Sequence, residues 1–127
     1  MKKRILIGDD VKIVRMVLRR FLERLAPNST IIESWDGSSI MDAFFAYEPE
    51  VVLLDVELPE IDGWEILRCI REVDPKVKVI MVTSSQTPED VQKAVELGAA
   101  GFVGKPFDLA ELSDALGLDY APLSASA

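Results

Sequence analysis

The sequence predicts a doubly wound α/β domain, in which an open parallel sheet carries helices on both faces. Three observations lead to this prediction. The sequence contains short aliphatic segments, and it contains longer segments whose apolar residues recur at helical spacing. The two kinds of segment alternate five times along the chain. Alternating strands and helices favour a parallel sheet with right-handed crossovers. Five such units are too few for a TIM barrel, so an open sheet is the expected architecture.

The first unit begins with an aliphatic strand at residues 5–7, which ends at Gly8 and the acidic pair Asp9-Asp10. The helix that follows is indicated by apolar residues three and four positions apart: Val14, Val17, Leu18, Phe21, Leu22 and Leu25. Pro27-Asn28-Ser29 ends this helix, and residues 30–34 are expected to form the second strand.

The second helix follows the turn Asp36-Gly37, and Ser38 or Ser39 is expected to cap it. Its apolar residues are Ile40, Met41, Phe44 and Phe45. Glu48-Pro49-Glu50 ends the helix. The continuous aliphatic run that then leads to Asp55 is typical of a strand buried on both faces of a parallel sheet.

The third helix is marked by Trp64, Leu67 and Ile70, and Asp74-Pro75 ends it. Residues 77–82 form the next aliphatic strand, which leads into Thr83-Ser84-Ser85. The fourth helix begins with Thr87 as N-cap, Pro88 at the first position and acids in the first turn. Its expected C-terminal cap is Gly98. Its inner face is expected to consist of Val91, Ala94, Val95 and Leu97.

The fifth unit is a short strand at residues 99–103, which Gly104-Lys105-Pro106 ends. Asp108 is expected to cap a last helix at residues 109–116, closed by Gly117. Residues 119–127 are small and unpatterned, so we expect a single domain at residues 1–118 and a flexible C-terminal tail at residues 119–127.

Composition excludes several classes of function. The formal net charge of −8 argues against binding of nucleic acid or of an anionic membrane. The absence of histidine excludes histidine-based acid–base catalysis and most zinc sites, and a single cysteine, Cys69, excludes an internal disulfide. The apolar run near the start is too short for a signal peptide or a spanning helix, so a cytoplasmic protein is expected.

The residues that follow the strands carry the candidate chemistry. A parallel sheet places the carboxyl ends of its strands at one edge, which would gather Asp9, Asp10, Asp55, Thr83 and Lys105. Separately, each has an ordinary explanation as a helix cap, a strand former or a surface charge. Together, three carboxylates would repel one another unless a cation lies between them, and such hard oxygen ligands suit Mg²⁺.

This combination contains the parts that phosphoryl transfer requires. A carboxylate can accept the phosphoryl group as an acyl phosphate, while a divalent cation, a hydroxyl group and an ammonium group stabilise the charge on its oxygens. Asp55, at the end of the buried strand, is the candidate nucleophile. We therefore expect Asp55 to accept a phosphoryl group at this edge of the sheet.

The chain resembles the receiver domain of two-component response regulators from residue 3 to about residue 116. The motif residues are Asp9-Asp10, Asp55, Pro59, Asp62-Gly63, Thr83 and Lys105-Pro106-Phe107. The resemblance implies a flavodoxin-like (βα)5 fold with strand order 2-1-3-4-5. It also implies that Asp55 accepts the phosphoryl group from a sensor histidine kinase or a phosphotransfer protein, and that the chain is a switch and not an enzyme.

The same resemblance implies roles for the residues around Asp55. Asp10, Asp55 and the backbone carbonyl of Glu57 would bind Mg²⁺ (or Mn²⁺) directly, and Asp9 would act through water. Thr83 and Lys105 would bind the phosphoryl oxygens. Thr83 and Phe102 would form the pair that changes conformation on phosphorylation.

Two further positions match variable residues that, in this family, tune loss of the phosphoryl group: Glu57 and Ser85. Between Thr83 and Ser85, Ser84 is small, as access for the phosphoryl group requires. The first helix, around Lys12, Arg15, Met16 and Arg19, is where the resemblance locates kinase specificity.

The output is expected to be a downstream partner protein that binds the face formed by the fourth helix, the fifth strand and the fifth helix. The fifth helix and its cap carry Asp108, Glu111 and Asp114 but no basic residue, so like charges would oppose a symmetric dimer there. We therefore expect a monomer, or a dimer that uses a different face.

Two alternatives remain open at this stage. A phosphohydrolase of the haloacid dehalogenase type also forms an aspartyl phosphate, but that family has a second aspartate where this chain has Glu57. An adaptor with a receiver fold would act without phosphorylation, and fold alone does not decide between these functions.

Overall fold

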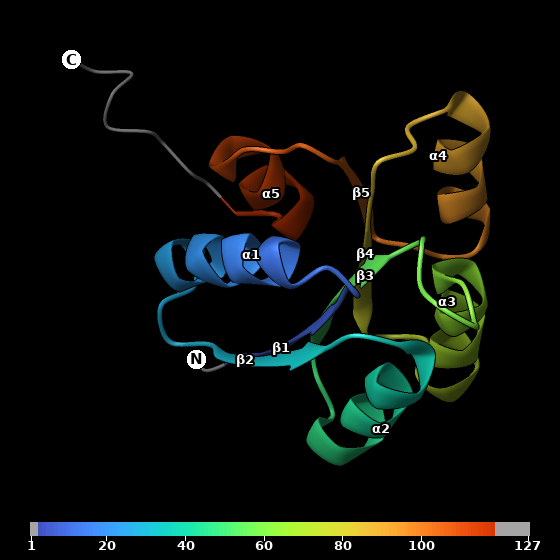
Figure 1. Ribbon diagram of the computed structural model, residues 1–127, viewed down its shortest axis with the longest axis horizontal. Helices are drawn as coiled ribbons and strands as arrows, with labels where there is room; N and C mark the ends of the chain where they lie inside the picture. The colour runs from blue at the N-terminus through green and yellow to red at the C-terminus, as the bar shows by residue number, and fades with distance from the viewer. Residues whose placement is uncertain (1–2, 119–127) are drawn as a thin grey trace.

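The computed structural model describes residues 3–118, which form a five-stranded parallel sheet with helices on both faces (Figure 1). The strands are β1 Arg4–Gly8, β2 Thr30–Ser34, β3 Val51–Asp55, β4 Lys78–Thr83 and β5 Gly101–Gly104. The helices are α1 Lys12–Leu25, α2 Gly37–Tyr47, α3 Gly63–Val73, α4 Pro88–Glu96 and α5 Leu109–Leu116. The strand order is β2-β1-β3-β4-β5, which confirms the predicted fold class and topology.

Each face of the sheet has its own hydrophobic core. Helices α1 and α5 cover one face, while α2, α3 and α4 cover the other (Figure 1). The α1 and α5 layer buries Leu18, Leu22, Leu112 and Leu116. The opposite layer buries Phe44, Trp64, Leu67, Ile70 and Ala94. Both layers contain fully buried side chains, as a sheet buried on both sides requires.

Strand β3 lies at the centre of the sheet, between β1 and β4. All five of its residues are buried, with Val51 and Leu53 in the α1 and α5 layer and Val52 and Leu54 in the other. Burial of each of these aliphatic side chains contributes roughly 2 kcal/mol to folding. The continuous aliphatic run is therefore explained by two buried faces, and it fixes where Asp55 leaves the sheet.

Most predicted element ends agree with the structure, and the differences are small. Residues 30–34 and the run ending at Asp55 form strands as predicted, but β1 includes Gly8 and the last two strands lie one or two residues later than expected. The cap of α2 is Asp36, whereas Ser38 or Ser39 was expected. Ser39 instead completes a capping box, in which its hydroxyl accepts from the Asp36 backbone N–H at 3.1 Å.

The N-caps of the helices after β4 and β5 are as predicted, with Thr87 accepting from Asp90 N and Asp108 from Glu111 N, whereas the C-cap of α4 is Leu97 and not Gly98. The predicted inner face of α4 is wrong in part, because Val91 and Val95 are 41% and 70% exposed and only Ala94 is buried. Similarly, Val17 and Phe45 lie at exposed positions. A helix of nine residues at the edge of a sheet turns one narrow stripe inward, so helical spacing overestimates its buried face.

Among residues 3–118, no helix is both long and apolar enough to cross a membrane. The expected tail at residues 119–127 lies outside the described residues.

Candidate functional site

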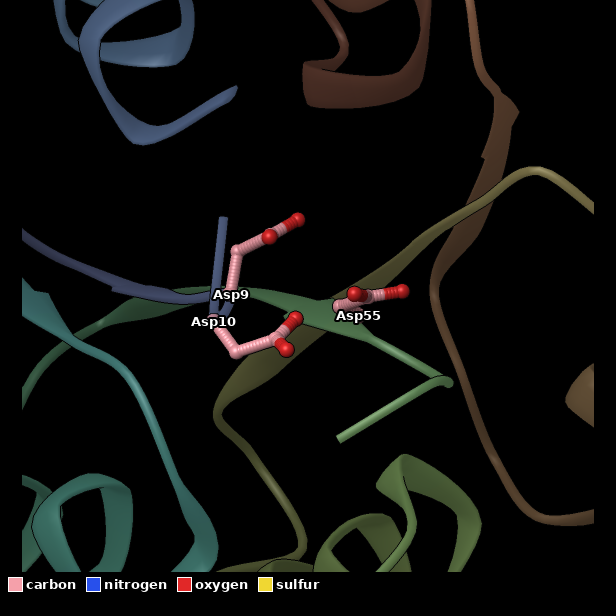
Figure 2. Close-up of side chains that lie close together, drawn as sticks. All are labelled: Asp9, Asp10 and Asp55. Carbon is pink, nitrogen blue, oxygen red and sulfur yellow. The ribbon is translucent and has the colours of Figure 1, made fainter. Parts of the chain in front are cut away.

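The predicted acidic residues meet at the carboxyl edge of the sheet. Asp9 and Asp10 follow β1, and Asp55 ends β3, the neighbouring strand (Figure 2). One carboxylate oxygen from each of the three residues lies within 4.8 Å of the others. The pairing of Gly8 with Leu54 brings the two strand ends level, so the β1–β3 register produces this cluster.

Asp9 is buried and both of its carboxylate oxygens have a partner. Oδ1 accepts from the backbone N–H of Val11 at 2.9 Å, and Oδ2 lies 2.8 Å from the Lys105 ammonium. Neither aspartate of the pair caps α1, whose N-cap is Val11 without a side-chain hydrogen bond. Capping is therefore not the explanation of the Asp9-Asp10 pair, and Asp10 is the exposed member of the cluster.

Asp55 is 4% exposed and its two oxygens have different environments. Oδ1 accepts from the Glu57 backbone N–H at 3.1 Å, while Oδ2 lies 3.3 Å from Lys105 Nζ. Burial, together with the negative charge of Asp9, raises the pKa of Asp55 from 3.8 to about 6, although Lys105 and the Glu57 N–H oppose the shift. At neutral pH the carboxylate is therefore ionised and only weakly stabilised, as suits a nucleophile.

Lys105 joins the two buried carboxylates from the end of β5. Its backbone N–H donates to the Thr83 carbonyl at 2.8 Å, and its peptide bond to Pro106 is cis. Burial alone would lower the pKa of Lys105, but its hydrogen bond to Asp9 and the charges of Asp9 and Asp55 raise it. The ammonium group therefore stays charged at the site.

Thr83 ends β4 and is fully buried. Its hydroxyl oxygen accepts from the Ser85 backbone N–H at 3.3 Å. The β3–β4 register pairs Asp55 with Val82, the residue before Thr83, so the threonine lies at the same edge as the acidic cluster. Phe102, in the next strand, is half-buried and packs against the core of the α2, α3 and α4 layer.

Three contacts at this site could not be predicted from the sequence. Arg15 is largely buried: its guanidinium donates to the Asp9 backbone carbonyl at 2.7 Å and pairs with Glu33 on β2. Arg15 is therefore held against the end of β1 and is not free on the surface of α1.

The second contact joins the loops after β3 and β4. The Ser84 hydroxyl donates to the Glu57 carboxylate at 3.0 Å.

The third contact explains the glycine of the Asp62-Gly63 motif. A Cβ atom at Gly63 would lie 2.8 Å from the Cα atom of Val56 and 2.9 Å from the carbonyl carbon of Asp55. Both neighbours are backbone atoms that cannot move aside independently. Glycine is therefore required where α3 begins against the loop that follows Asp55.

The donor set fits a hard divalent cation. Asp9, Asp10 and Asp55 supply only oxygen ligands. Among residues 3–118, no histidine or cysteine belongs to this cluster. Uncompensated, three carboxylates this close would repel, and Lys105 offsets only part of their charge. A cation such as Mg²⁺ would complete the balance.

The sequence is similar to those of known proteins. A family model described as the response regulator receiver domain matches residues 5–117. The chain is 34% identical to a chemotaxis protein CheY of Halobacterium salinarum, over 91% of this chain and 95% of the relative. It is 32% identical to sporulation initiation phosphotransferase F of Bacillus subtilis, over 99% of each chain.

Solved structures give the same result for the fold. The signal receiver domain of a DNA-binding response regulator from Colwellia psychrerythraea superimposes with a TM-score of 0.84 at 30% sequence identity. The match covers 91% of this chain and 95% of that one.

Proposed function

The chain belongs to the response regulator receiver domain family, and from this membership we propose that Asp55 accepts a phosphoryl group and makes the domain a signalling switch. The observation that carries the proposal is the buried Asp55 carboxylate, which lies beside a second buried carboxylate and within 3.3 Å of the Lys105 ammonium. A purely structural role would not require two buried acids around one lysine at the edge of a sheet.

We assign the metal site to Asp10, Asp55 and the backbone carbonyl of Glu57, with Asp9 acting through water. This division is supported by the partners of Asp9, because both of its oxygens already accept from Val11 and Lys105. Asp10 is exposed and its carboxylate lies within 4.8 Å of the other two. When bound, Mg²⁺ (or Mn²⁺) would supply positive charge for the phosphoryl oxygens.

In the proposed transfer, an Asp55 carboxylate oxygen forms a bond to phosphorus as the bond between phosphorus and the donor nitrogen breaks. The donor nitrogen leaves with the electron pair of that bond. Lys105 stabilises the charge on the phosphoryl oxygens, and the Thr83 hydroxyl donates to one of them. The N–H of Glu57 keeps the other carboxylate oxygen of Asp55 in place.

The phosphoryl donor is proposed to be a sensor histidine kinase or a phosphotransfer protein. An apolar groove of about 350 Å³, lined by residues of α1 and of the loop after β5, lies directly beside Lys105. Its exposed apolar residue Ile13 and the exposed Lys12 and Met16 are available to a donor. Arg15 and Arg19 pair with Glu33 and are less available to a donor. Of the four residues expected on α1 to determine kinase specificity, Lys12 and Met16 are therefore the better candidates.

The output is proposed to pass through the face formed by α4, β5 and α5. A hollow of about 500 Å³ there is lined by Phe102, Glu111, Asp114 and other residues of these elements. In the switch, Thr83 moves toward the phosphoryl group, and the half-buried Phe102 turns into the space that it leaves. The changed face would then bind a downstream partner protein.

One experiment tests the proposed function. The protein is incubated with Mg²⁺ and a small-molecule phosphodonor such as acetyl phosphate, and its intact mass is measured. A single phosphoryl increment that Asp55→Asn abolishes is expected. No increment would favour the phosphorylation-independent adaptor, and multiple turnover on a phosphate ester would favour a phosphohydrolase.

A further inference from the structure

The loops that follow β3 and β4 are joined by a hydrogen bond between two exposed side chains beside Asp55. The Ser84 hydroxyl donates to a Glu57 carboxylate oxygen at 3.0 Å. The backbone of Glu57 is itself fixed, because its N–H donates to Asp55 Oδ1 at 3.1 Å. The Glu57 side chain therefore starts at the acidic cluster but ends on the neighbouring loop.

The Glu57 carboxylate lies outside the acidic cluster. Among the described residues, the cluster whose oxygens lie within 4.8 Å of one another contains Asp9, Asp10 and Asp55 but not Glu57. Glu57 is only two residues from Asp55 and has a longer side chain than any acid of the cluster. Without a partner on the β4 side, nothing in its backbone position keeps its carboxylate from the cation.

We propose that Ser84 is a positioning residue that holds the Glu57 carboxylate away from the metal site and so makes the site selective for Mg²⁺ over Ca²⁺. The inference rests on the proposed function, because it concerns the metal site assigned there. Mg²⁺ requires near-octahedral coordination and retains several waters, so a fourth protein carboxylate adds little to its binding. Ca²⁺ accepts more oxygen ligands in flexible arrangements, so it gains more from a fourth carboxylate.

The same loop provides a matched control. Ser85 also has a hydrogen-bonded hydroxyl, but its partner is the Asp90 carboxylate and not Glu57. Its backbone N–H, which donates to the Thr83 hydroxyl, is retained in Ser85→Ala. Removing the Ser85 hydroxyl therefore changes the loop to a similar degree without releasing Glu57.

The test is calorimetric titration of the unphosphorylated protein with Mg²⁺ and, separately, with Ca²⁺. Ser84→Ala is expected to lower the Kd for Ca²⁺ about two- to fivefold, a change at the lower end of what one hydrogen bond contributes, and to change the Kd for Mg²⁺ less. In the Glu57→Gln background, Ser84→Ala is expected to have no effect on either Kd. Ser85→Ala is expected to have the same Kd values for Mg²⁺ and Ca²⁺ as the unmodified protein.

The inference is overturned if Ser84→Ala leaves the ratio of the two Kd values unchanged, if it has the same effect with Gln at position 57, or if Ser85→Ala reproduces it. An unmodified protein that binds neither cation also overturns it. Failure of the proposed function is a separate result. In that case the unmodified protein binds Mg²⁺ but acquires no phosphoryl mass from acetyl phosphate.

Discussion

The Lys105 ammonium lies 2.8 Å from Asp9 Oδ2, an ion pair between the ends of β5 and β1. Asp9 is 1% exposed, so its charge would be costly without this partner. The pairing also distinguishes the two adjacent aspartates. Asp9 is held within the protein, whereas Asp10 is exposed at the cluster and available to a cation.

Replacement of Lys105 by methionine is predicted to have opposite effects on metal binding and on phosphoryl transfer. Loss of one positive charge beside the cluster should lower the Kd for Mg²⁺ roughly tenfold at low ionic strength. The same change removes charge stabilisation from the phosphoryl oxygens, so uptake from acetyl phosphate should slow by more than about a hundredfold. Calorimetry and intact-mass kinetics measure the two effects.

Lys76→Met is the control for this prediction. Lys76 is exposed just before β4, at the edge of the sheet opposite the acidic cluster, and it is also a single lysine charge. It should change neither quantity beyond about twofold. If Lys105→Met weakened Mg²⁺ binding, the lysine would be supporting the metal site and not opposing the cation.

Glu57→Ala is predicted to lengthen the lifetime of the phosphorylated form about three- to tenfold. The Glu57 backbone N–H donates to Asp55 Oδ1, and the exposed Glu57 carboxylate, which accepts from the Ser84 hydroxyl, can also accept from a water molecule that approaches the phosphoryl group. Decay of the phosphoryl mass increment after removal of the donor gives the rate. Equal decay rates for the unmodified protein and Glu57→Ala would contradict the prediction.

The protein is predicted to remain monomeric when it is phosphorylated. Helix α5 and its cap present Asp108, Glu111 and Asp114, and a symmetric contact would place these charges against their own copies. Sedimentation with beryllium fluoride, a phosphoryl mimic, and Mg²⁺ measures the oligomeric state. A tight dimer that the charge-reversing Glu111→Lys disrupts would contradict the prediction.

The fold was predictable because the relevant signals are local and repeated. Aliphatic runs such as Val51–Asp55 and helix caps such as Thr87 and Asp108 act within a few residues, and each lies where the sequence indicated. The acidic cluster follows from topology, since parallel strands end at one edge. The exposure of Val91 and Val95 was not predictable, because it depends on how α4 packs against the sheet.

The finer contacts of the site depend on distances that sequence spacing does not contain. Ser84 and Glu57 are 27 residues apart, and Arg15 and Asp9 meet through a backbone carbonyl. A basic residue on an amphipathic helix is usually solvated, so no pattern marked Arg15 as partly buried. Such contacts can be seen only in the three-dimensional structure. Asp55, in contrast, could be predicted as the candidate nucleophile from the sequence.

Asp55→Asn is predicted to stabilise the metal-free protein at neutral pH. Because the pKa of Asp55 is raised from 3.8 to about 6 in the folded protein, its ionised form is disfavoured by folding. The stability linked to this group is therefore present below about pH 4 and is lost as the pH rises through 6. Asparagine keeps the shape and removes the charge, so the free energy of unfolding should rise by about 1–3 kcal/mol at pH 7.5.

The pH dependence of this gain is the decisive measurement. Urea unfolding with EDTA should show the advantage of Asp55→Asn shrinking as the pH falls through 6 and vanishing near pH 4, where Asp55 is neutral in the folded protein. Asp114→Asn, an exposed acid on α5, is the control and should show no such trend. Added Mg²⁺ should reduce the difference by stabilising the unmodified protein. A variant less stable than the unmodified protein at pH 7.5 would show that ionised Asp55 contributes to folding and would contradict the raised pKa.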